Sequence, residues 1–230
     1  MAVIKLGAAV AAASGKLGGG VFSRNRAGNY MRTYVKPINP QSDAQQIIRN
    51  RLTGLIQSWR GLTDAQRLAW NAITGNFTSK NKVGDVIFLT GQQLFNKFNS
   101  NLLAADESIV TTPPLNSDEP AITITEVVAA SAELTISIDV AAVPVTATTI
   151  IRATDGLSAG RSNSYKSDFK QISAGPVFAV NDYDAKTDYE AVFGLLSGKV
   201  GQKVFVEVVT MDIASGQVVG RSKMSDIIAA

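Results

Sequence analysis

The side chains best suited to recognition chemistry gather near the start of this chain. They combine cationic groups with phenol rings, and they are Arg24, Arg26, Tyr30, Arg32, Tyr34 and Lys36. Arginine pairs with phosphate and stacks on aromatic rings, which suits nucleic acid. Arginine and tyrosine are also favoured anchors where one protein binds another. We therefore predict a partner-binding site here, for a neighbouring protein first, nucleic acid second and, failing both, a solvated surface.

The side chains most used in catalysis are missing from the sequence. It contains no cysteine and no histidine. Their absence excludes disulfides, thiolate nucleophiles and every serine–histidine arrangement, and it removes the usual zinc ligands. We expect no enzymatic activity, no cofactor and no metal ion.

Two motifs that often carry chemistry are incomplete. The glycines around Lys16 lack the spacing of a phosphate-binding loop, because Gly7 lies eight residues before Gly15 and Leu17 follows the lysine. An acidic cluster occurs later, at Asp182, Asp184, Asp188 and Glu190. It lacks the glycine-centred loop of a calcium site, so we expect a solvated loop there.

Charge divides the chain into two halves. Residues 1–110 carry 13 Lys and Arg against 5 Asp and Glu, whereas residues 111–230 carry 9 against 14. Such asymmetry usually reports on partners. Residues 111–120 contain three prolines and read as an extended linker between a basic and an acidic part.

The first 35 residues read as an arm. Residues 1–13 are apolar but poor in Leu, Ile and Phe, so we do not expect a secretory signal, and no apolar run approaches the roughly 20 residues of a membrane span. Residues 14–20 are so rich in glycine that we expect them to need outside contacts to become ordered. Residues 21–24 and 30–35 predict a β-hairpin whose longer loop covers residues 25–29. In its second strand Arg32 lies between Tyr30 and Tyr34 on one face.

Residues 36–110 predict a helical module. Three helix-start signals with Gln three positions after Ser or Thr occur at Ser42, Thr63 and Thr90. Apolar residues follow each signal at three- and four-residue steps, the first set being Ala44, Ile47, Ile48, Leu52, Leu55 and Trp59, the second Ala65, Leu68, Ala69, Ala72 and Ile73, and the third Leu94, Phe95, Phe98, Leu102 and Leu103. We expect the three helices to pack along these stripes, with Trp59 and Trp70 in or near the shared core.

Residues 121–230 change to a period of two. Apolar residues alternate with polar or smaller ones near positions 122–124, 134–140 and 204–208. Several short strands separated by turn signals predict an antiparallel β-sandwich of immunoglobulin or fibronectin type III kind. Residues 204–221 resemble, in pattern only, the last hairpin of such a domain. The predicted fold class is therefore α+β, with a hairpin arm, a helical module and a β-sandwich.

Several motifs recur in order between residues 15 and 103. They are the run SRNRAGNY at residues 23–30, then Arg32, Asn39-Pro40, Gln45, Arg51, Trp59 and the run LTDAQRLAW at residues 62–70. In these the chain resembles a family of small tailed-bacteriophage proteins, which are described only as structural proteins of the virion. The resemblance does not extend to the C-terminal domain, and it implies no defined site residues.

The residue composition and the family resemblance both favour a structural role. We expect a component of a bacteriophage virion, assembled in the host cytoplasm as a capsid-associated, connector or tail protein. Its partners would be other virion proteins and copies of itself, with nucleic acid secondary and no membrane. The alternatives are a DNA-binding accessory protein and a secreted adhesin or carbohydrate-binding module.

Overall fold

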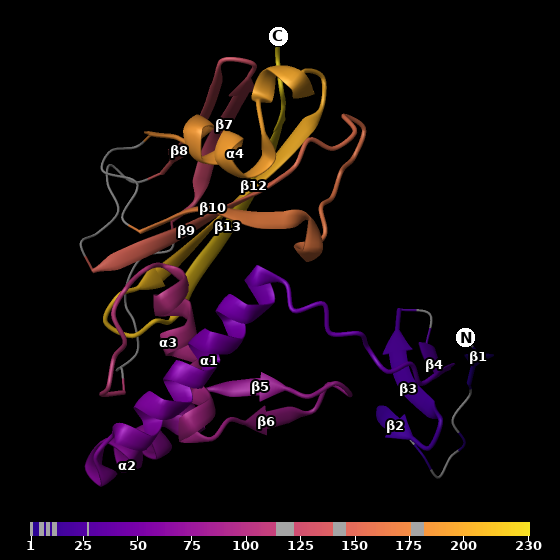
Figure 1. Ribbon diagram of the computed structural model, residues 1–230, viewed down its shortest axis with the longest axis vertical. Coiled ribbons are helices and arrows are strands. Elements are labelled where there is room, and N and C mark those ends of the chain that lie inside the picture. Colours follow the sequence, from indigo (N-terminus) through magenta and orange to yellow (C-terminus); the bar gives the residue numbers. More distant parts are fainter. Residues whose placement is uncertain are drawn as a thin grey trace.

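The computed structural model of the protein describes residues 2–4, 7, 10, 13–26, 28–113, 122–139, 146–175 and 182–230. Along the chain, an N-terminal antiparallel sheet precedes a small helical module, and further antiparallel sheets follow (Figure 1). The α+β class is therefore confirmed at this level. Within the described part of the chain, no helix is long and apolar enough to cross a membrane. Lys5 and most of the predicted linker, residues 114–120, lie outside the described residues.

Four short strands build the N-terminal sheet, in the spatial order β1 (Ala2–Val3), β4 (Gly28–Thr33), β3 (Gly20–Asn25) and β2 (Gly15–Leu17). The predicted hairpin corresponds to β3 and β4, but its loop is shorter than expected, because Asn25 pairs with Gly28. The glycine-rich run, which we expected to need outside contacts to become ordered, forms β2 and pairs with β3. Gly18 turns the chain there with a left-handed φ of +56°.

The helical module contains two of the three predicted caps. Its elements are α1 (Asp43–Gly61), α2 (Asp64–Ala72), a 3₁₀ turn (Ile73–Asn76), β5 (Thr78–Lys80), β6 (Val86–Phe88) and α3 (Gly91–Ala104). At the start of α2, Thr63 and Gln66 satisfy each other's backbone amides, and Thr90 and Gln93 do the same for α3. Ser42 makes no such side-chain bond, so the first predicted capping box is wrong.

The core of this module forms where α1, α2 and α3 meet. The fully buried Trp70 packs edge-on against Phe95, with ring centroids 5.5 Å apart, and Trp59 lies beside the same ring. The prediction for the two tryptophans is thus confirmed. The predicted apolar stripe on α1 is only partly covered, however, because α1 has 19 residues and is longer than α3, which has 14. Three of its large side chains are exposed, namely Ile47, Ile48 and Leu52, and Leu68 on α2 is exposed too.

Two antiparallel sheets share the core of the C-terminal domain. Their elements are β7 (Ile124–Ala130), β8 (Glu133–Ile138), β9 (Ala147–Thr154), a 3₁₀ turn (Lys166–Asp168), β10 (Phe169–Gly175), β11 (Asp182–Asp184), α4 (Lys186–Phe193), a second 3₁₀ turn (Leu196–Lys199), β12 (Lys203–Asp212) and β13 (Val218–Ile227). One sheet has the order β10-β9-β12-β13 and the other β11-β8-β7. Buried side chains of both, such as Ile136, Ile151 and Val206, belong to one apolar cluster. The predicted last hairpin corresponds to β12 and β13, which pair antiparallel.

The helical module packs directly on the C-terminal domain. Ala105, which follows α3, joins an apolar cluster with Ile150, Val209 and Met211 on the outer face of the four-stranded sheet. Asn101 donates a hydrogen bond of 3.0 Å to the Gly216 carbonyl. These contacts place the sheet and α3 against each other, so the two parts are not merely tethered (Figure 1).

Gly216 occupies the tightest point of this junction. Its φ is +70°, and a Cβ there would lie 2.9 Å from the carbonyl carbon of Phe98. We predict that Gly216→Ala lowers the free energy of unfolding by about 2 kcal/mol or more, from backbone strain and overpacking together. Urea denaturation measures the change, and Gly160→Ala, which meets nothing within 4 Å, is the matched control. Equal stability of the two variants would contradict the prediction.

Candidate interaction surface

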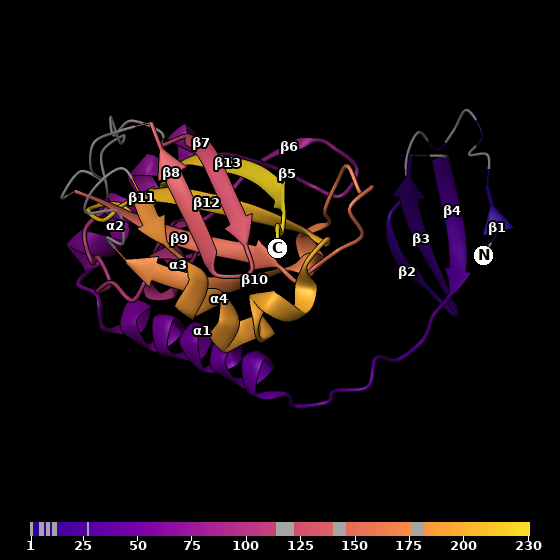
Figure 2. The same cartoon turned by 90° about the horizontal axis from the view of Figure 1, so that it is seen from above.

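The N-terminal sheet stands apart from the rest of the molecule. Figures 1 and 2 both show it joined to α1 by a single stretch of chain, residues 34–42. All of those nine residues are exposed. Among the residues whose burial is described between positions 3 and 42, none is buried. A sheet this small buries little apolar surface of its own, and units of this size usually need further contacts to be stable.

One face of the sheet carries part of the predicted site. Tyr30 and Arg32 are two positions apart on β4 and therefore point to the same side. Lys16 joins them, because it lies beside Val21 and Val21 pairs with Arg32. The Lys16 ammonium lies 3.9 Å from the centroid of the Tyr34 ring. We call Lys16, Tyr30, Arg32 and Tyr34 the aromatic–basic face.

The remaining predicted residues are not on this face. Arg24 pairs with Asn29, and this register directs it to the opposite side from Tyr30. Arg26 lies in the turn between β3 and β4, and Lys36 lies in the exposed segment after the sheet. The structure therefore brings Tyr30, Arg32 and Tyr34 together and separates Arg24, Arg26 and Lys36 from them.

The opposite side of the sheet carries, besides Arg24, an apolar cluster that the sequence did not predict. Phe22 pairs with Met31, and Leu17 pairs with Gly20 on the same side. Leu17 is 73% exposed and Met31 is 40% exposed, while Phe22 is half-buried. We call Leu17, Phe22 and Met31 the apolar face. Phe22 and Leu17 also line a shallow hollow with Val10.

Exposed apolar side chains continue along the chain beyond the sheet. Val35 is 68% exposed and Ile38 is 91% exposed in the connecting segment. On α1 the uncovered stripe of Ile47, Ile48 and Leu52 follows. These side chains add to the exposed apolar surface that the N-terminal third of the chain presents. The sequence does show the apolar stripe on α1, but we predicted that this stripe packs against the other two helices.

The predicted acidic loop has regular structure instead. Asp182 and Asp184 lie on β11, and Asp188 and Glu190 lie on α4. Tyr183 donates a hydrogen bond to the Asp188 carboxylate and accepts one from the Ser173 hydroxyl. Burial and the Asp188 carboxylate raise the pKa of Tyr183 to about 12, so this phenol stays protonated near neutral pH. No group of three or more acidic residues that could hold a metal ion occurs in the described part of the chain.

Comparison with known proteins gives no relative. No protein family matches the sequence, no curated protein is similar to it, and no solved structure shares its fold detectably.

Proposed function

We propose that this chain is a non-enzymatic structural subunit of a tailed-bacteriophage virion, and that it binds neighbouring subunits through its N-terminal module. The partners are other virion proteins and copies of the chain itself, in a capsid-associated, connector or tail position. The phage assignment rests on the resemblance carried by residues 23–30 and 62–70. The assembly role rests on the N-terminal sheet.

One observation carries the assembly role. The sheet has an apolar face and no buried residue of its own among those described, and it extends from the body on an exposed segment. Covering exposed apolar surface contributes about 20 to 30 cal/mol of stabilisation per Å². An exposed apolar face of this kind is therefore expected where a partner covers it. A neighbouring subunit is such a partner.

We further propose that the C-terminal domain is a β-sandwich of the fibronectin type III kind. In sandwiches of the immunoglobulin class, the first, second and fifth strands share one sheet, and the third, sixth and seventh share the other. The orders β11-β8-β7 and β9-β12-β13 agree with this division. β10 pairs with β9 and extends the second sheet. The helix α4 between β11 and β12 is an addition to the basic pattern.

Nucleic acid is a second candidate partner, favoured by the aromatic–basic face. Tyr30 and Tyr34 offer rings for base stacking, while Arg32 and Lys16 offer positive charge for phosphates. Binding of this kind weakens steeply as salt concentration rises. In a virion both faces can be used, the apolar face for protein and the aromatic–basic face for the packaged genome.

Hydrogen exchange tests the assembly role. In the isolated chain we expect amides of residues 15–33 to exchange rapidly, because the sheet lacks a core that would oppose local opening. In purified particles the same amides should be protected about a hundredfold more strongly, since a covering subunit stabilises the closed state. Mass spectrometry of peptides measures both states, with α3 (Gly91–Ala104) as a segment protected in each. Equal protection of residues 15–33 in both states, or absence of the chain from the particles, would refute the role.

A further inference from the structure

A pocket of about 610 Å³ opens on the outer face of the four-stranded sheet in the C-terminal domain. It is lined by Arg152, Ser164, Lys166, Phe169, Glu207, Arg221 and Lys223. Four of these side chains are cationic and one is a carboxylate. The pocket is therefore strongly positive, although residues 111–230 as a whole carry 9 basic against 14 acidic residues.

Strand pairing fixes the floor of the pocket. Glu207 on β12 lies directly between Arg152 on β9 and Lys223 on β13, so the three side chains share one face of the sheet. Glu207 is 3.4 Å from Arg152 and 3.9 Å from Arg221, measured between carboxylate oxygens and guanidinium nitrogens. A single carboxylate neutralises one positive charge, so most of the charge of the floor stays uncompensated.

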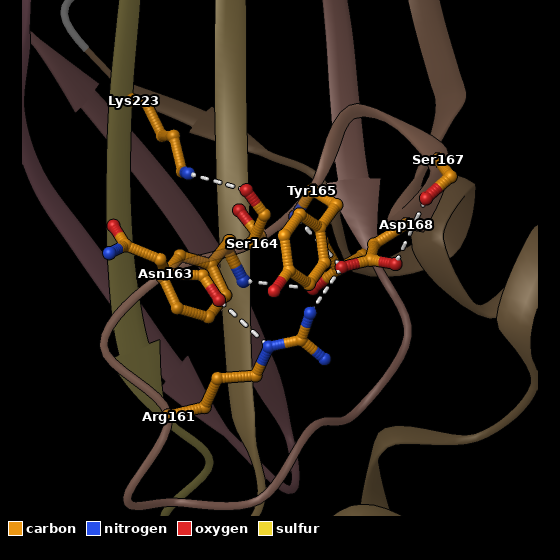
Figure 3. A network of polar contacts seen from close by, with 9 residues as sticks. Arg161, Asn163, Ser164, Tyr165, Ser167, Asp168 and Lys223 are labelled. Carbon is orange, nitrogen blue, oxygen red and sulfur yellow. Dashed lines mark hydrogen bonds and ion pairs between the residues drawn. The ribbon is translucent and has the colours of Figure 1, made fainter. Parts of the chain in front are cut away.

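The loop between β9 and β10 forms a wall that is ordered by its own contacts (Figure 3). Arg161 lies 2.7 Å from the Asp168 carboxylate and donates to the Asn163 carbonyl at 2.7 Å. The Tyr165 amide donates to the same Asp168 carboxylate at 2.9 Å. Because Arg161 and Asp168 pair with each other, neither changes the charge balance of the pocket.

Ser164 and Lys166 are the residues that this wall contributes to the pocket. The Ser164 hydroxyl is buried and has no hydrogen-bond partner among the residues that the structure describes. Its carbonyl accepts a hydrogen bond of 3.5 Å from the Lys223 ammonium, which links the wall to the floor (Figure 3). A buried hydroxyl without a partner loses about 1 to 3 kcal/mol of hydration, and an acceptor on a ligand would recover it. The wall therefore adds one neutral donor to a ring of cations.

The pocket is distinct from the junction between the domains. The helical module covers the part of the same sheet face that contains Ile150, Val209 and Met211. Gln171, in the same row as Arg152 and Glu207, donates a hydrogen bond of 2.9 Å to the Ala104 carbonyl at the end of α3. Lys223 ends that row on β13 and Arg221 ends the neighbouring row of Ile150 and Val209, and both side chains are exposed at this edge of the sheet.

We propose that this pocket binds a small phosphate monoester. A dianionic phosphoryl group offsets the excess charge of Arg152, Lys166, Arg221 and Lys223 better than a single carboxylate does, and it offers three acceptor oxygens. The Phe169 ring provides an apolar wall for the organic part of the ligand. The volume lies within the range of about 300 to 1,000 Å³ that is common for small-ligand sites. The inference does not depend on the proposed virion role, because it concerns the other end of the chain.

Isothermal titration of the full chain with glucose 6-phosphate tests the site, with glucose and acetate as matched ligands. We expect binding of glucose 6-phosphate alone, and at least a tenfold loss of affinity in the double variant Arg221→Ala, Lys223→Ala, which removes two charge-assisted contacts. Both side chains are exposed, so the variant should fold, and its thermal midpoint checks this.

Lys170→Ala is the control variant. Lys170 lies on β10 but pairs with Ala153, a core residue, so it faces the opposite side of the sheet from the pocket. It should bind glucose 6-phosphate as the parental chain does. Failure of the parental chain to bind glucose 6-phosphate, equal binding of acetate, or equal losses in Lys170→Ala and the double variant would each overturn the proposal.

Discussion

Replacing Phe22 and Met31 together by serine should greatly weaken the association of this chain with its neighbours. The two side chains face each other across β3 and β4 and form the centre of the apolar face. Both are partly covered within the sheet, so covering the remainder in an interface contributes about 1 to 2 kcal/mol for each. Losing about 3 kcal/mol weakens association about a hundredfold.

Incorporation of the variant into particles measures the effect directly, and sedimentation velocity measures self-association of the purified chain. Leu195→Ser is the matched control, because Leu195 is 67% exposed and lies in the C-terminal domain, far along the chain from the sheet. The control should assemble normally. If the double variant assembles as well as the control, the apolar face is not the interface.

The aromatic–basic face separates the protein and nucleic-acid interpretations. Tyr30 and Arg32 lie on the other side of the same sheet, so their replacement by alanine leaves Phe22 and Met31 in place. If the main partner is a subunit bound on the apolar face, these replacements change assembly less than the serine pair does. If DNA is the main partner, they abolish its salt-dependent binding while assembly persists.

The register of the N-terminal hairpin explains why the residues of the predicted site do not all lie on one face. A loop over residues 25–29 would have paired Arg24 with Tyr30 and gathered them on one face. The structure pairs Asn25 with Gly28, and that slip of one residue moves Arg24 to the other side. The apolar face was missed for the same reason, since Leu17, Phe22 and Met31 come from three strands and meet only once the register is known.

Sequence signals that involve only a few neighbouring residues were more reliable than those that depend on which helices pack together. The caps at Thr63 and Thr90 involve residues three positions apart, so the sequence contains all their parts. How much of α1 is covered depends instead on the length of α3, which nothing in α1 encodes. We predicted a loop in place of α4 because the segment is rich in acidic residues. The sequence alone does not show that Tyr189 is fully buried and holds this helix against the core. The cationic pocket on the four-stranded sheet could not be predicted, because its basic residues come from separate strands and a loop.

Among stability changes, Trp70→Ala should have the largest effect. Trp70 has no exposed surface, and its ring contacts Phe95 and Phe98 at centroid distances of 5.5 and 6.2 Å. Truncating a buried tryptophan leaves a large cavity and lowers the free energy of unfolding by about 3 to 5 kcal/mol. Urea denaturation followed by the fluorescence of the remaining Trp59 measures the loss, because Trp59 packs against the same core.

Trp70→Phe distinguishes the contribution of ring packing from that of the indole hydrogen bond. The indole nitrogen donates a hydrogen bond of 2.8 Å to the Thr111 carbonyl, which ties the end of the helical module to the segment that leads into the C-terminal domain. Phenylalanine keeps most of the packing but leaves that carbonyl without this donor, so we expect a loss of about 1 to 3 kcal/mol, smaller than in the alanine variant. Proteolysis should also become faster near Thr111, since the segment loses an anchor. A loss equal to that of Trp70→Ala would show that the hydrogen bond, and not the ring, supplies most of the stabilisation.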